Sequence, residues 1–238
     1  MAQRYGILAG LAIALMVADV HAAEVGSTNV RTATVRLASV TTVADANVVG
    51  LSGATKQVED YFNDLTTLQA NFKQTVTGEA KPSTGTFYLS RPGKFLWQYE
   101  APVRQRIIST GSAAYYVDQE RNQVTQLPMD AGVARLFNAK ILNLSKQGLR
   151  ATHVQTMASQ LSVDFAVDKK IATSDQAGLV NLKLTFDRLG NGRLQLRQID
   201  ALDTLSVTTR VEFSSMRENV NLPTKLFDFT PGVYDQRN

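Results

Sequence analysis

Apolar and polar residues alternate through most of this chain, and this period of two limits the fold more than any other feature of the sequence. Alternation of this kind is typical of β-strands with one buried and one exposed face. Turn sequences such as TGS, QERN and DRLGNG separate the runs, which suits antiparallel neighbours. We therefore expect one curved antiparallel sheet with a single buried side. The alternating runs lie at 70–76, 86–90, 95–99, 104–109, 113–118, 123–127, 161–167, 180–186, 194–196 and 205–213, with a last strand predicted at KLFDF, 225–229.

Two stretches break the alternation and predict helices that cover the sheet. Apolar residues recur at spacings of three and four over 58–68, which gives one apolar helix face. A shorter stripe of Val133, Leu136 and Phe137 follows Asp130, a residue suited to a helix N-cap. An incomplete antiparallel β-barrel of about eleven strands encloses more space than its own side chains fill. We therefore expect a mainly β fold (α+β) with an apolar cavity covered by a helical lid.

The first residues have the layout of a cleavable export signal. Arg4 precedes an apolar run over 7–18, and small residues follow it, a pattern typical of a secretory signal and too short to span a bilayer comfortably. We expect the signal peptide to cover residues 1–22 and to direct the product to the periplasm. A flexible N-terminal extension is expected over 23–51, which contains no aromatic residue, and a folded domain over 52–238.

The chain contains no cysteine, which excludes disulfides, thiol catalysis and acylation of an N-terminal cysteine. Past the export signal only His153 remains, so a metal site with two histidines is excluded as well. A serine triad built on His153 stays open, although no G-x-S-x-G motif is present. Glu59, Asp60 and Asp64 are interpreted as the solvated side of a helix. We expect no enzyme activity, no cofactor and no metal.

The net charge of the chain is +4, and its basic residues are spread thinly along the sequence. Proteins that bind nucleic acid gather basic residues beside aromatic ones, so we expect no nucleic-acid partner. A modest positive excess suits contact with anionic membrane surfaces or acidic partners, but a solvated surface is the favoured interpretation. We expect a monomer.

The hairpin GTFYLSRPGKFLWQY, residues 85–99, is richer in large rings than a solvent-facing hairpin needs. Phe87 and Leu89 share one face of its first strand, and Arg91 is the next residue on that face. Pro92 favours an extended conformation at the preceding residue, so Arg91 is expected to point inward at the rim of the apolar face. A guanidinium there needs partners, and oxygens of the lid helix are the nearest candidates. An exposed turn arginine and an ordinary aromatic core are the alternatives.

Four segments, in order along the chain, are distinctive: LQANFKQTVT, GTFYLSRPGKFLWQYEAP, IISTGSAAYYVDQERNQVTQ and FDFTPGVYDQR. Together they resemble the outer-membrane lipoprotein carrier family, LolA. The resemblance extends from about Thr55 to Arg237, essentially the whole predicted domain. Its most specific part is a strand followed by Arg-Pro, then Phe-x-Trp, then a proline.

This resemblance implies a periplasmic carrier that binds the acyl chains of lipoproteins released from the inner membrane. The implied partners are acylated lipoproteins, an inner-membrane ABC lipoprotein exporter and an outer-membrane receptor lipoprotein. Because that receptor is itself lipid-anchored, the missing cysteine favours the carrier. A periplasmic lipid- or lipoprotein-binding sensor, or a specialised lipid shuttle of the same fold, is the alternative; such regulators usually have a second domain, which we do not expect here.

The resemblance also assigns roles to individual residues. It makes Arg91 the latch of the lid and places Phe95 and Trp97 at the acyl-chain site. The alternation of the strands adds further residues to the expected lining of the cavity, and the lid helix is expected to contribute the stripe already described. The added lining residues are Phe72, Phe87, Leu89 and Tyr99.

Overall fold

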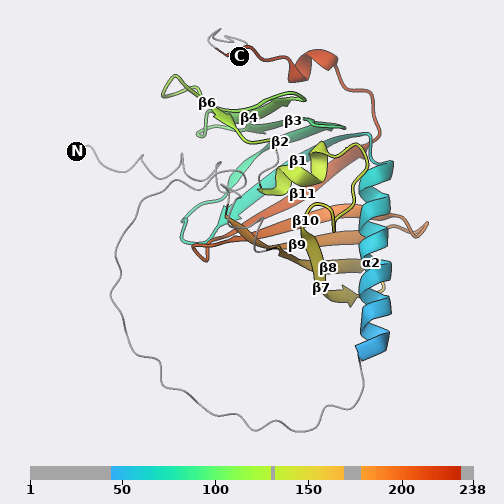
Figure 1. The fold of residues 1–238 in the computed structure, drawn as a ribbon. Coiled ribbons are helices and arrows are strands. Elements are labelled where there is room, and N and C mark those ends of the chain that lie inside the picture. Colours follow the sequence, from blue (N-terminus) through green and yellow to red (C-terminus); the bar gives the residue numbers. More distant parts are fainter. Residues whose placement is uncertain (1–43, 130–131, 169–177, 232–238) are drawn as a thin grey trace, which may run out of the picture.

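The computed structural model describes residues 44–129, 132–168 and 178–231. The strands in these residues form one antiparallel sheet. The strands are β1 (Thr67–Val76), β2 (Ser83–Ser90), β3 (Lys94–Tyr99), β4 (Gln105–Thr110), β5 (Ala114–Asp118), β6 (Gln123–Leu127), β7 (Leu149–Thr156), β8 (Gln160–Val167), β9 (Leu179–Arg188), β10 (Leu194–Asp203) and β11 (Thr208–Glu218). Their order in the 11-stranded sheet is β6-β5-β4-β3-β2-β1-β11-β10-β9-β8-β7. Within the described residues β6 and β7 are the two edges and do not pair, so the barrel is incomplete (Figure 1). The predicted incomplete antiparallel barrel of about eleven strands is confirmed.

The long helix α2 (Ala44–Asp64) crosses one end of the sheet and contacts β7, β8 and β10 (Figure 1). Its buried face contains Val58 and Phe62, as the spacing over 58–68 predicts. The helix begins within the range 23–51 that the sequence analysis assigns to an extension. Ala54, one turn before Val58, is already buried, so the apolar face starts earlier than the large residues indicate.

The short helical lid lies where the sequence analysis expects it. It consists of the 3₁₀ turn η1 (Gly132–Ala134) followed by the helix α3 (Arg135–Asn138), which contacts β3. Residues 1–22, most of 23–51, and the predicted N-cap Asp130 lie outside the described residues.

Strand alternation produces the buried inner face of the sheet. In β8 and in most of β9, every second residue is buried, and these residues join those of α2 and α3 in one apolar cluster. Gly85 shows how tightly this face is packed, because a Cβ there would lie 2.7 Å from the ring of Phe72 and would also meet the carbonyl oxygen of Gln98. Phe72 and Gly85 are direct cross-strand partners, so the ring covers the glycine.

Gly85→Ala is therefore expected to reduce the free energy of unfolding by about 1–3 kcal/mol, because the added methyl overpacks the core. The matched control is Gly53→Ala in α2, where a Cβ would meet nothing within 4 Å. That change should stabilise the protein by about 0.5–1 kcal/mol through helix propensity. Denaturant unfolding of both variants measures the two effects, and equal shifts would contradict the packing described here.

Part of the outer face of β3, β4 and β5 is also buried, which corrects the expectation of a single buried side. A second apolar cluster combines Leu96, Ile108 and Val117 of these strands with Phe227. Residues 224–227 form the 3₁₀ turn η2 (Thr224–Phe227) on β3 and β4 instead of the strand predicted at KLFDF. The apolar side chains of that segment pack on a face of the sheet, and its backbone does not form a strand. The alternating spacing there therefore did not indicate a strand.

Candidate functional site

Arg91 connects the sheet to both helical elements. It follows β2, is half-buried, and donates from Nη2 to the carbonyl oxygen of Ala139 at 2.7 Å and from Nη1 to that of Leu65 at 3.5 Å. Ala139 directly follows α3 and Leu65 directly follows α2. The backbone N–H of Gly93 also donates to the carbonyl of Phe137 at 3.1 Å. The side chain therefore points inward as predicted, and its acceptor lies at the end of the lid helix.

The closed junction leaves some polar atoms unsatisfied. Burial lowers the pKa of Arg91 from its usual value, but arginine starts so high that the group stays charged. Within the described structure, Nε of Arg91 and both polar side-chain atoms of Asn138 are buried without a hydrogen-bond partner. Each such group costs about 1–3 kcal/mol. The closed arrangement is therefore less stable than a fully satisfied one.

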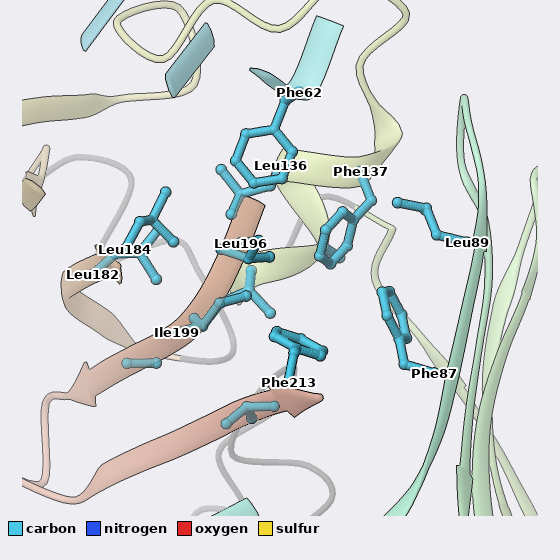
Figure 2. Packing of buried hydrophobic residues seen from close by; sticks show 14 of the residues in the cluster. Phe62, Phe87, Leu89, Leu136, Phe137, Leu182, Leu184, Leu196, Ile199 and Phe213 are labelled. Carbon is cyan, nitrogen blue, oxygen red and sulfur yellow. The ribbon is translucent and has the colours of Figure 1, made fainter. Parts of the chain in front are cut away.

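Aromatic rings from the sheet, the lid and α2 meet in the interior. Phe87 lies 4.2 Å from Trp97 and 5.4 Å from Phe137 between ring centroids. Phe137 of the lid is also 6.3 Å from Phe95 and 6.3 Å from Phe62 of α2. Figure 2 shows Phe62, Phe87 and Phe137 directed toward a common centre. Phe137 of the lid thus packs directly on the rings of Phe87 and Phe95 and covers this part of the interior.

Every residue predicted to line the interior belongs to this buried cluster, as does the predicted lid stripe. The lining residues are Phe72, Phe87, Leu89, Phe95, Trp97 and Tyr99, and the lid residues are Val133, Leu136 and Phe137. Sequence reasoning did not select Phe213, whose ring lies 5.9 Å from Phe87 and 6.0 Å from Trp97. Its position on an alternating run is the signal that would have found it.

Tyr99 marks a more polar end of the same interior. Its hydroxyl donates to Oε1 of Gln74 at 2.9 Å, and both residues are buried. Burial raises the pKa of Tyr99 above its ordinary value, so the hydroxyl stays protonated. Tyr99 pairs with Gly85 whereas Phe95 pairs with Leu89, which places this hydroxyl at the end of the hairpin away from Arg91.

Side chains of α2 hold the chain that follows the lid helix. Asn63 accepts from the backbone N–H of Leu142 at 2.7 Å and donates to its carbonyl at 3.1 Å. Glu59 accepts from the N–H of Leu144 at 2.8 Å, so its interpretation as a solvated residue is wrong. Asp60 agrees with that interpretation, since among the described residues its carboxylate pairs only with exposed Lys56, at 2.8 Å. Asn63 has no sequence signal, because it lies on the polar side of the helix.

His153 is exposed on the edge strand β7. Across 44–129, 132–168 and 178–231 no group of three His, Cys, Asp or Glu side chains is placed to hold a metal ion. In the same residues, each helix is too short or too polar to cross a bilayer.

Residues 63–230 match the profile of the family described as outer membrane lipoprotein carrier protein LolA. The chain belongs to the LolA family. An outer-membrane lipoprotein carrier protein from Dechloromonas aromatica is 30% identical over 200 residues, covering 82% of this chain and 92% of that protein. One from Methylococcus capsulatus is 28% identical over 191 residues, covering 74% and 82%. The crystal structure of a LolA superfamily protein from Nitrosomonas europaea has a TM-score of 0.42 and 12% identity, covering 75% of this chain and 97% of that one.

The LolA match contains the hairpin, Arg91 and the whole lid, but only the last two residues of α2, Asn63 and Asp64. Glu59 precedes the matched range. The bonds between α2 and the chain after the lid therefore lie at or beyond the limit of what the family profile covers.

Proposed function

We propose that this LolA family member is a periplasmic carrier that shields the acyl chains of lipoproteins in its apolar interior. One observation supports this most directly: Arg91 bonds the carbonyls that follow α2 and α3 above a buried set of aromatic rings. Hydrogen bonds over an apolar cluster can break and re-form, and a site that admits and releases a large apolar ligand requires this.

The same arrangement accounts for transfer. Each buried methylene of an acyl chain contributes about 0.8 kcal/mol, so several chains in an open apolar site would bind too tightly to leave. Here the lid ring Phe137 occupies the space above Phe87 and Phe95. Cargo has to displace that ring and break the bonds of Arg91, and this cost weakens net binding. The carrier therefore holds its cargo and still hands it on.

The expected route has a donor and an acceptor in the two membranes. An inner-membrane ABC exporter supplies the acylated lipoprotein, and an outer-membrane receptor lipoprotein accepts it from the monomeric carrier. The absence of cysteine from the chain rules out anchoring through an acylated N-terminal cysteine, which suits a protein that moves between membranes. Export by the signal peptide over 1–22 would place it in the periplasm.

Native mass spectrometry of the protein isolated from periplasm tests the proposal. We expect a fraction of molecules to hold an acylated protein, and depletion of the carrier to leave outer-membrane lipoproteins in the inner membrane. A bound lipid without a protein, together with unchanged lipoprotein sorting, would favour a lipid sensor or specialised shuttle instead. Molecules that never hold an acyl chain would contradict the proposal in either form.

A further inference from the structure

The chain from the start of η1 onward is held together as one unit, which we define as the lid segment, residues 132–148. Arg135 is buried and donates from Nε to the carbonyl of Gly132 at 2.8 Å and from Nη1 to that of Gln147 at 3.1 Å. These bonds tie the beginning of the lid segment to its end. Because the segment is held together internally, its attachment to the rest of the protein determines whether it opens.

Two side chains of α2 attach the lid segment to that helix. Asn63 bonds both backbone groups of Leu142, and Glu59, one helical turn earlier, bonds the backbone of Leu144. Side chains four residues apart lie on the same side of a helix. One side of α2 thus holds two backbone positions of the lid segment, two residues apart.

These bonds matter energetically although Asn63 is exposed and Glu59 half-buried. Leu142 is 2% exposed and Leu144 is fully buried, so their backbone N–H groups lie at the boundary of the core. A backbone donor there needs a partner. The chain between Ala139, which Arg91 bonds, and Leu142 is different, because Ile141 is 76% exposed and faces solvent.

We propose that Asn63 and Glu59 form a second latch, which sets the balance between closed and open lid independently of Arg91. The inference rests on the proposed function, because it assumes that the lid opens for an acylated ligand. Arg91 fastens the lid segment at Ala139 and the two α2 side chains fasten it at Leu142 and Leu144. Both residues are positioning residues: they touch the lid backbone and not the aromatic interior.

Hydrogen exchange of the Leu142 and Leu144 amides measures the latch directly. We expect Asn63→Ala to speed exchange at Leu142 and Glu59→Ala to speed it at Leu144, each by roughly 5-fold or more for a lost hydrogen bond. Glu59→Gln keeps an acceptor and should restore most of the protection at Leu144. Asp60→Ala removes a carboxylate on the same helix whose ion pair is with Lys56, and it should leave both amides unchanged.

The Asn63 variants also distinguish a latch from a residue that only stabilises α2. Alanine favours a helix more than asparagine does, so Asn63→Ala should leave α2 as stable as before, or more so, while the lid segment loosens. Asn63→Asp, which keeps the acceptor and loses the donor, should give an intermediate exchange rate and serves if the alanine variant does not fold. Unchanged exchange at Leu142 in both Asn63 variants would overturn the latch.

Binding of an N-palmitoylated peptide separates failure of the latch from failure of the carrier function. We expect Asn63→Ala to raise affinity for this peptide and Asp60→Ala to leave it at the wild-type value. If amide exchange becomes faster but neither the wild type nor the variants bind the peptide, Asn63 and Glu59 do fasten the lid segment and the carrier function is rejected. If the peptide binds but exchange of the lid amides is unchanged, the carrier function stands and the latch is rejected.

Discussion

Arg91→Leu should leave the protein folded and trap lipoprotein on it. The leucine removes the bonds to Ala139 and Leu65, so the closed lid loses stabilisation that the cargo-bound state never had. It also removes the buried Nε that has no partner, which limits the cost to overall stability. Bonds to a charged donor contribute about 1.5–3 kcal/mol, so transfer of cargo should fall by about tenfold or more.

The experiment compares how much lipoprotein co-purifies with each variant and how much moves to outer membranes. Arg91→Lys is the matched control, because a single ammonium keeps the charge but lacks the planar fork that reaches two carbonyls. It should lie between wild type and leucine. If wild type and Arg91→Leu release cargo equally well, Arg91 is not a latch.

Phe137→Ala should make acylated ligands bind more tightly. Phe137 is fully buried against Phe87, Phe95 and Phe62, so its ring competes with an incoming chain for the same space. Its removal destabilises the closed lid by up to about 3–5 kcal/mol, and relaxation of the neighbouring side chains reduces this loss. We expect the affinity for an N-palmitoylated peptide to rise by about ten- to a hundredfold.

Phe229→Ala is the control for loss of a ring outside the interior. That ring packs on Tyr115, with centroids 5.1 Å apart, and belongs to the cluster on the outer face. Its removal should lower the free energy of unfolding without changing peptide affinity. Weaker peptide binding in Phe137→Ala would mean that the ring is a contact for the ligand and not a competitor.

The alternation of strands predicted the inner wall of this protein well. Phe87, Leu89 and Arg91 share one face because consecutive side chains of a strand point to opposite sides, and the structure places all three on that face. The stripe of the lid helix followed from helical spacing in the same way. Local periodicity thus determines which side chains enter the interior.

Contacts between distant segments were not predictable in this way. The predicted strand at KLFDF is instead a 3₁₀ turn that places Phe227 on the outer face of the sheet, because nothing in its own residues indicates which surface it will meet. Asn63 and Glu59 look like solvated helix residues, and their role depends on the backbone of Leu142 and Leu144. A hydrogen bond to a backbone group does not depend on the residue type of the partner, so the sequence does not reveal it.

Fluorescence of Trp97 tests the central claim most directly. It is the sole tryptophan of the chain, is 1% exposed, and lies among the rings of the interior. A peptide carrying an acyl chain brominated along its length should quench its emission, and the unbrominated peptide should bind equally well without quenching. Saturable binding of the brominated peptide with Trp97 emission unchanged would place the acyl chain elsewhere and contradict the account.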